Sequence, residues 1–482
     1  MSSTATASRS RTLLTVASAV FVGVALTLGG ATHGEAISSA LVRLAALPLL
    51  AMALFTITRD GVRREALWPL AILIAALAVP LVQMIPLPPA LWTALPGRAV
   101  IAEGFKAGGV SLPWLPISLA PSGTLDALLS LIPPAAIFLA ALNMDERERR
   151  LLTLVVVACA LLGTLLGAAQ VGSGQDSGLR FYAVTNADSA VGFFANRNHY
   201  AALLVIALPL TAYWLAYSEG RSGGQTAVYM LIAAGVLVVF LVSLGVTRSR
   251  AGIGLGALAV LLSAVLLWFS SSVPRIVPVL LVAGLMIGGG LVSAFALDPL
   301  MHRFQDPVAS EARVTLLPGL MAAIKTFMPV GSGLGSFVPV YQIFERPETV
   351  LAQYVNHAHD DYLEILIETG LIGAALILAF IAWYVQAGVR AAGWPSGRDH
   401  DLPRVAAVVV LLVLIHSVVD YPLRTAGISV VFALACALLT PAAAGQARQR
   451  RRVSGAPAND GARNPQARRL PSRPSVSTRD HR

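Results

Sequence analysis

A few short polar stretches interrupt an otherwise apolar chain, and they hold the residue types that could do chemistry. The sharpest is Asn356-His357-Ala358-His359-Asp360-Asp361-Tyr362-Leu363-Glu364. A neutral imidazole can accept a proton at neutral pH, so His359 is a candidate general base. His357, Asp360 and Glu364 stand within reach of the same place and are candidates for binding a substrate.

Other interpretations of this stretch stay open. Zinc sites of the form His-x-His-x-Asp-His begin in the same way, but Tyr362 stands where the last His belongs, so we predict no metal here. Asp360 or Asp361 can act as a helix N-cap beside any catalytic role. Glu364 and Glu368 lie one helical turn apart, so they can pair with an arginine or hold a histidine in place.

Two arginine-bearing stretches lie upstream. In Gly192-Phe193-Phe194-Ala195-Asn196-Arg197-Asn198-His199-Tyr200, the amides of Asn196 and Asn198 can cap a helix or, with Arg197, bind a glycan. Thr247-Arg248-Ser249-Arg250 is a short turn between apolar blocks. Its two arginines either snorkel from a helix end or serve an anionic partner, which a bidentate guanidinium fits well.

Two further stretches lie downstream. Arg313 precedes Pro329-Val330-Gly331-Ser332-Gly333-Leu334-Gly335, whose glycine pattern lacks the Gly-Lys-Ser/Thr ending of a P-loop and therefore indicates a turn. His416-Ser417-Val418-Val419-Asp420-Tyr421-Pro422-Leu423-Arg424 follows an apolar block. There, Asp420 and Arg424 either pair with each other or bind a substrate.

The composition shows what must position these residues. The chain has 482 residues, of which 56% are hydrophobic and 12% charged, whereas soluble proteins carry about 25% charged residues. Both cysteines, Cys159 and Cys436, stand in apolar blocks, which excludes a disulfide framework. We therefore predict an all-α integral membrane protein.

Windows of about nineteen apolar residues predict twelve membrane spans. The spans lie at Thr12–Gly30, Ile37–Ile57, Ala66–Ile85, Thr124–Leu142, Leu151–Val171, His199–Tyr217, Ala227–Val246, Ala251–Ser270, Ile276–Ala296, Tyr362–Gln386, Val405–Val419 and Ala426–Thr440.

The predicted domains follow from these spans and from the basic residues between them. Residues 1–11 form a cytoplasmic N-terminus, residues 12–440 the membrane domain, and residues 441–482 a disordered basic tail. That tail has ten Arg and two Asp and so carries 10 − 2 = +8 of the net charge of +10, which argues against a nucleic-acid surface. Because short cytoplasmic loops are rich in Lys and Arg, both termini are predicted to be cytoplasmic. The long loop 297–361 then faces the periplasm.

Taken together, the polar stretches resemble the O-antigen ligase and polymerase superfamily of bacterial inner-membrane glycan transferases. Phe194-Ala195-Asn196-Arg197-Asn198 is similar to its Phe-x-Asn-Pro-Asn stretch, with Arg197 in place of Pro. Ser249-Arg250 is similar to its Ser-Arg pair, and Arg313 to an Arg early in its large periplasmic loop. His359-Asp360, nine residues, Gly370, two residues and Gly373 resemble its His-Asn, nine, Gly, two, Gly signature, with Asp360 in place of Asn. The resemblance covers about half of the chain.

The resemblance implies a GT-C-like fold and a metal-independent, inverting glycosyltransferase that needs no cofactor. Its donor would be an undecaprenyl-pyrophosphate-linked glycan, and its acceptor a glycan or lipid A-core, in lipopolysaccharide or exopolysaccharide biosynthesis. His359 would be the general base, and Arg250 and Arg313 would stabilise the leaving pyrophosphate, with Arg197 next to them. The sequence does not separate a ligase from a polymerase.

A transporter or flippase of lipid-linked glycans is the rival interpretation. Alternating access needs polar groups through the middle of the membrane. The predicted spans are nearly free of charged residues at mid-depth, and the polar stretches gather at one face, which favours transfer over transport.

Overall fold

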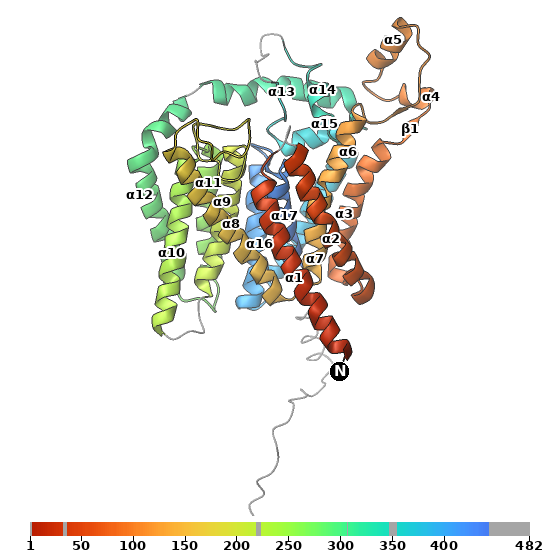
Figure 1. The fold of residues 1–482 in the computed structure, drawn as a ribbon. Helices are drawn as coiled ribbons and strands as arrows, with labels where there is room; N and C mark the ends of the chain where they lie inside the picture. The colour runs from red at the N-terminus through yellow and green to blue at the C-terminus, as the bar shows by residue number, and fades with distance from the viewer. Residues whose placement is uncertain (1, 32–35, 218–222, 306, 347–353, 443–482) are drawn as a thin grey trace, which may run out of the picture.

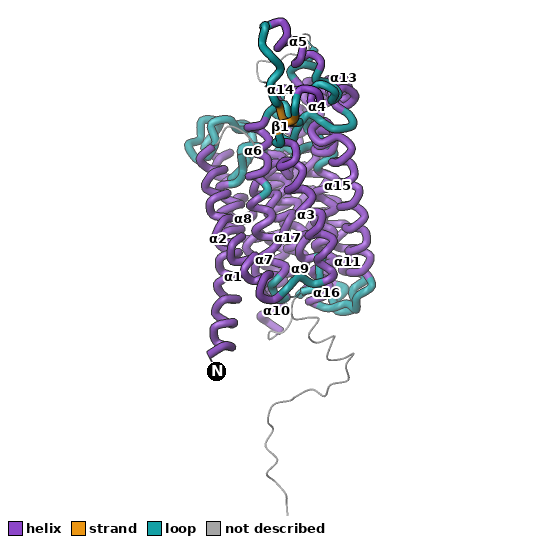
Figure 2. Tube along the Cα trace, turned by 90° about the vertical axis from the view of Figure 1, so that its right-hand side faces the viewer, coloured by secondary structure: helices purple, strands orange, loops and turns teal. Residues whose placement is uncertain are grey.

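The computed structural model describes residues 2–31, 36–217, 223–305, 307–346 and 354–442. Most of these residues lie in helices, and the long helices run side by side in one bundle (Figures 1 and 2). We call the end of the bundle that carries α13 and α14 the loop end, and the opposite end, where α1 begins, the terminal end.

Ten helical segments of the described chain are long and apolar enough to cross a membrane, which confirms the all-α membrane class. One of them, Pro121–Leu142, is divided into α6 (Pro121–Ser130) and α7 (Ile132–Leu142) at a break before two prolines, which cannot donate hydrogen bonds. The others lie in α1 (Ser2–Leu28), α2 (Ala36–Asp60), α3 (Arg64–Gln83), α8 (Glu146–Gly172), α9 (Arg197–Ala216), α10 (Gly223–Val246), α11 (Arg250–Trp268), α12 (Ile276–Gln305) and α15 (Asp361–Ala392).

The last two predicted spans form helices that differ from the other ten. The helix α16 (Arg398–His416) begins with a charged turn, and α17 (Ala426–Leu438) has only 13 residues. Both are packed inside the bundle, with α17 against α7 and α16 against α9. Twelve crossings therefore stay a prediction, whereas the helical nature of all twelve segments is confirmed.

The long segments between spans are folded. Residues 84–120 contain α4 (Pro89–Trp92), α5 (Ala99–Ala107) and a two-residue antiparallel pair, β1 (Pro86–Leu87) with β2 (Leu115–Pro116). The predicted loop 297–361 contains the end of α12, α13 (Pro307–Phe327) and α14 (Phe337–Tyr341), which cross the loop end (Figure 1). Apolar side chains of α13, α14 and the first turns of α15 form a second hydrophobic core there.

The membrane bundle has its own core, in which α9 is buried along 94% of its span. Cys159 and Cys436 are buried packing residues. At the terminal end, the buried carboxylate of Asp401 accepts hydrogen bonds from Tyr217 and Ser270 and pairs with Arg404, which ties α9, α11 and α16 together. The predicted disordered tail, beyond its first residues, lies outside the described residues.

Candidate active site

Three segments that are distant in sequence meet around the ring of Tyr421 at the loop end. The start of α9 supplies His199, whose ring centroid lies 4.9 Å from that of Tyr421. The segment before α15 supplies His357 at 4.3 Å and His359 at 5.0 Å. The structure thus joins the sequence stretches 192–200, 356–364 and 416–424 into one histidine-rich cluster.

His359 faces the buried carboxylate of Asp420. Its Nδ1 lies 3.4 Å from Asp420 Oδ1, and Asp420 is fully buried while the side chain of His359 is 31% exposed. A carboxylate at Nδ1 favours the tautomer with hydrogen on that nitrogen, which leaves the lone pair of Nε2 to accept a proton. His359 also has a φ of 54°, a left-handed conformation that non-glycine residues rarely adopt. The contact and the exposure fit a general base.

His357, in the same short segment, is held by Glu364. Its Nδ1 lies 2.8 Å from Glu364 Oε1, and the backbone N–H of Ala358 donates to Glu364 Oε2 at 2.9 Å. The Ala358 side chain is buried in the second core. Glu364 therefore fixes the backbone that presents His359, which confirms the expectation that a carboxylate one turn into α15 holds a histidine.

Asp360 is the N-cap of α15, because its Oδ1 accepts hydrogen bonds from the N–H groups of Tyr362 and Leu363. The next residue, Asp361, accepts a hydrogen bond from the hydroxyl of Ser417 at 2.8 Å. These bonds join the start of α15 to the end of α16 and so place His359 beside Asp420.

Arg424 and Asp420 do not pair with each other, contrary to one interpretation of the sequence. Arg424 instead lies 3.5 Å from Asp361, 3.4 Å from Glu364 and 3.1 Å from Glu368. The two side chains separate because three carboxylates on one face of α15 surround the guanidinium, whereas Asp420 is turned toward the histidines. Arg424 thus serves the scaffold.

Glu368 explains the glycine stretch before α14. Its Oε1 accepts hydrogen bonds from the N–H groups of Gly335, at 2.8 Å, and Phe337, at 3.3 Å. Backbone amides that could cradle a phosphate are therefore occupied by a carboxylate of the same chain. Gly331, Gly333 and Gly335 all have positive φ, as the expected turn requires.

The electrostatics of the cluster follow from burial and from these partners. Burial would raise the pKa of Asp420, but the hydrogen bond with His359 and the nearby His199 outweigh it, so the pKa lies below its ordinary value. Burial would lower the pKa of Arg424, but Glu364, Glu368 and Asp361 raise it. Burial raises the pKa of Asp360 and that of Tyr421. Asp420 is therefore an anion that can stabilise a protonated His359.

A second polar group lies around the start of α9 and the turn between α10 and α11. Asn196 is the N-cap of α9 and accepts a hydrogen bond from the N–H of Asn198 at 2.8 Å, which confirms the capping interpretation. Arg197 lies 3.6 Å from Asp188, which also lies 3.6 Å from Arg248. Asp188 gave no signal in the sequence, because a single acid in a Gly- and Ser-rich loop has no informative spacing.

Of the predicted arginines Arg250 and Arg313, the structure describes the side chain of Arg250 only. Arg250 is the first residue of α11 and is half-buried, and Ser249 before it caps the helix by accepting a hydrogen bond from the N–H of Gly252. Arg313 lies in α13, but its side chain is outside the described part of the structure. Its place relative to His359 stays a prediction.

Sequence analysis missed the part that Tyr421 and His199 play. Both ring nitrogens of His199 are buried without a hydrogen-bond partner, and its ring packs against Tyr421. A histidine beside two asparagines was visible in the sequence, but its burial was not. Among the described residues, no group of three His, Cys, Asp or Glu side chains is arranged to hold a metal ion.

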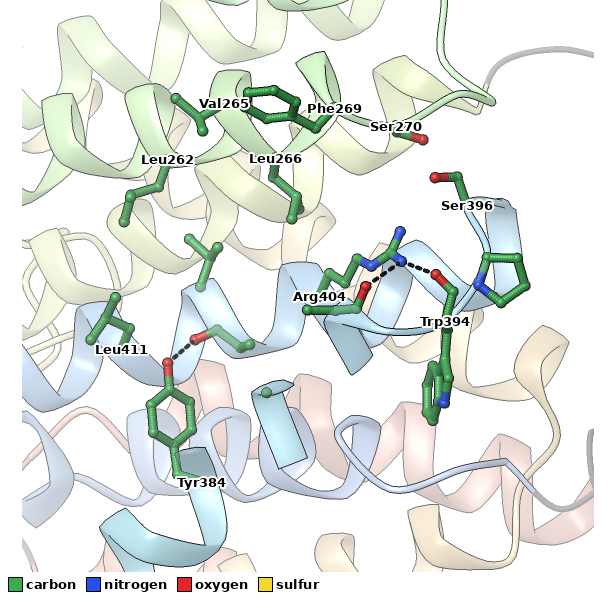
Figure 3. Close-up of a pocket in the computed structure, with 15 residues that line it drawn as sticks. Leu262, Val265, Leu266, Phe269, Ser270, Tyr384, Trp394, Ser396, Arg404 and Leu411 are labelled. Carbon is green, nitrogen blue, oxygen red and sulfur yellow. Dashed lines mark hydrogen bonds between the residues drawn. The ribbon is translucent and has the colours of Figure 1, made fainter. Parts of the chain in front are cut away.

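The structure also contains an apolar cavity of about 730 Å³ between α11, α15 and α16 (Figure 3). Its lining includes Phe269, Trp394 and Arg404. The guanidinium of Arg404 donates to the carbonyls of Ala391, in the last turn of α15, and Trp394, just beyond the helix. The cavity lies near the terminal end, about 40 Å along α15 from the histidine cluster at a rise of ~1.5 Å per residue. It contains none of the predicted site residues.

A family model matches part of the chain. Residues 235–378 match the family model described as O-Antigen ligase, a range that runs from within α10 through Arg250, Arg313 and His359 to the middle of α15. No curated protein matches the chain. The match covers residues 235–378 of the 482-residue chain and supports its resemblance to the O-antigen ligase superfamily.

Proposed function

We propose that this protein is an inner-membrane glycosyltransferase that moves or polymerises glycan from an undecaprenyl-pyrophosphate donor at the periplasmic face. The observation that carries the proposal is the pair of His359 and Asp420, a partly exposed imidazole held by a buried carboxylate within a segment that matches the O-antigen ligase family. Such a pair suits the removal of a proton from a sugar hydroxyl.

The reaction can be written around these residues. The acceptor hydroxyl oxygen attacks the anomeric carbon of the donor sugar, the bond from that carbon to the phosphate oxygen breaks, and His359 takes the hydroxyl proton. A single in-line displacement inverts the anomeric carbon. Asp420 stabilises the imidazolium that forms, as buried carboxylates do in other base-orienting pairs.

The departing pyrophosphate gains negative charge as the bond breaks. Arginine forks can stabilise that charge without a metal, and Arg250, Arg313 and Arg197 are the residues that we assign to this task. The contacts favour supporting roles for His357, Asp360, Glu364 and Arg424, which build the segment that carries His359. Asn196 and Asn198 are proposed to bind the glycan from the start of α9.

The apolar faces of the helices suit the polyprenyl chain of the donor. An even number of spans would put both termini on one side of the membrane, and the Lys and Arg of the short loops favour the cytoplasm for that side. The acceptor is either a lipid A-core, which makes the protein a ligase, or a lipid-linked or exported glycan, which makes it a polymerase. The segment 84–120, with α4 and α5, projects from the loop end and suits acceptor recognition (Figure 2).

The test is deletion of the gene in the source bacterium, followed by complementation with wild type, His359→Ala or His400→Ala. His400 is an exposed histidine at the terminal end and is the matched control. We expect wild type and His400→Ala to restore the glycan and His359→Ala to fail while present in the membrane. A bare core with accumulated lipid-linked polymer indicates a ligase, and a core with a single repeat or lost exopolysaccharide indicates a polymerase. Restoration by His359→Ala would remove the general-base proposal.

A further inference from the structure

Arg248 has an unusual backbone conformation. Among the described residues, Arg248 and His359 are the two non-glycine residues with positive φ, at 55° and 54°. Left-handed conformations are strained for residues with a Cβ, and such strain collects at functional sites. One of the two is the proposed base, so the conformation of the other calls for an explanation.

Arg248 occupies a position where glycine is the usual residue. Its N–H donates to the carbonyl of Gly245 at 3.0 Å at the end of α10, the place where a left-handed residue ends many helices. The turn is tightly built, because the buried hydroxyl of Thr247 donates to the Leu244 carbonyl and accepts from the N–H of Ser249. A glycine here would end the helix without strain, so the arginine costs stability at this position.

The side chain of Arg248 is aimed at a carboxylate that it shares with Arg197. Asp188 lies 3.6 Å from each guanidinium, and the side chains are 33%, 33% and 15% exposed for Arg248, Asp188 and Arg197. The segment that carries Asp188 is rigidly attached, because Arg180 donates to three of its carbonyls and the N–H of Ala190 donates to the carbonyl of Val246.

We propose that Arg248 is a further phosphate-binding residue and that Asp188 is an internal counter-ion, which the donor's pyrophosphate replaces between Arg248 and Arg197. The inference rests on the proposed function. Contacts of 3.6 Å are longer than charge-assisted hydrogen bonds of about 2.7–2.9 Å, so phosphate oxygens can exchange for the carboxylate with a gain in contact. The carboxylate keeps the two arginines close together while the site is empty.

The test measures binding of inorganic pyrophosphate to the purified full-length protein by calorimetry. Asp188→Asn removes the carboxylate that competes with pyrophosphate and is expected to tighten binding about tenfold. The reason is that the carboxylate and the bound pyrophosphate, both negative, would lie a few ångströms apart in a partly buried site and repel each other. Arg248→Gly is expected to weaken binding about tenfold while its melting temperature stays equal to or above that of wild type. The controls are Asp126→Asn and Arg275→Ala, which remove the same charges elsewhere.

Each outcome decides. If Asp188→Asn weakens binding, Asp188 organises the arginines and is not a competitor. If Arg248→Gly binds as wild type does, or melts well below it, Arg248 is a structural residue. The transferase proposal is tested separately, by complementation with His359→Ala. If that variant still makes glycan, the general-base proposal fails, but the pyrophosphate titrations of the Asp188 and Arg248 variants are not affected.

Discussion

Replacement of Gly370 by alanine tests how the site is held together. Gly370 lies in the kink of α15 with φ 59° and ψ −138°, a region open essentially to glycine alone. A Cβ there would lie 2.1 Å from the carbonyl oxygen of Pro329 and 2.9 Å from the N–H nitrogen of Gly331. Both atoms belong to backbone, so either the kink or the glycine stretch has to move.

The cost follows from the bonds that hold these two parts together. The N–H of Leu371 donates to Pro329 at 2.9 Å, and the N–H of Gly333 donates to Glu368 at 2.8 Å. Each such bond contributes about 1 kcal/mol, and the backbone conformation costs a residue with a Cβ about 1–3 kcal/mol. We therefore expect Gly370→Ala to lower the free energy of unfolding by about 3–5 kcal/mol.

The assay is thermal unfolding of the detergent-purified protein, with Gly388→Ala as the matched control. Gly388 lies in the same helix, and a Cβ there meets no atom within 4 Å. That substitution should leave stability unchanged or raise it by about 0.5–1 kcal/mol, since alanine favours helix. Equal melting temperatures for Gly370→Ala and Gly388→Ala would refute the role given to the kink.

Three further predictions concern the charged residues. Arg424→Gln leaves three buried carboxylates without their cation and should destabilise the protein by about 3–5 kcal/mol. The control, Arg150→Gln, breaks an exposed pair with Asp399 and should cost under about 1 kcal/mol. Chemical unfolding measures the free energy of unfolding of both variants. Asp360→Asn keeps the N-cap and removes a carboxylate whose pKa is raised by burial, a shift that costs stability once the pH exceeds the ordinary carboxyl value. Its melting temperature should equal or exceed that of wild type at pH 7, and a clear decrease would contradict this. The lowered pKa of Asp420 contributes to folding stability at pH values above the ordinary carboxyl pKa. This contribution is lost as the pH falls below about 4. The melting temperature should therefore fall less steeply between pH 7 and pH 3 for Asp420→Asn than for wild type.

The membrane class and the residues of interest could be predicted from the sequence. Apolar runs of about twenty residues are sufficient to locate helices in a membrane, because the backbone must satisfy its hydrogen bonds internally there. For the same reason all twelve predicted segments are helical. The short motifs around Asn196, Arg250 and His359 were also visible, since residue types and spacing carry a family resemblance without any knowledge of contacts.

The partners of those residues were decided by the tertiary structure. In the sequence, Asp420 and Arg424 are four residues apart and look like a pair. Their actual partners are 56 to 63 residues away in α15 and the segment before it, because α15 and α16 are antiparallel and bring their loop-end residues together. Hydropathy shows where each helix crosses but contains no information on which helices are neighbours.

The packing of α13 and α14 at the loop end could not be predicted from the sequence for a related reason. Residues 297–361 are less apolar than a span and so read as a loop, yet α13 and α14 gain a hydrophobic core by packing on α15. The glycine stretch was correctly predicted to be a turn, but the carboxylate of Glu368 that accepts hydrogen bonds from its amides could not be predicted. The sequence by itself thus determined the helices and the chemical groups at the site. The pairing of those groups depends on long-range packing, which no local pattern encodes.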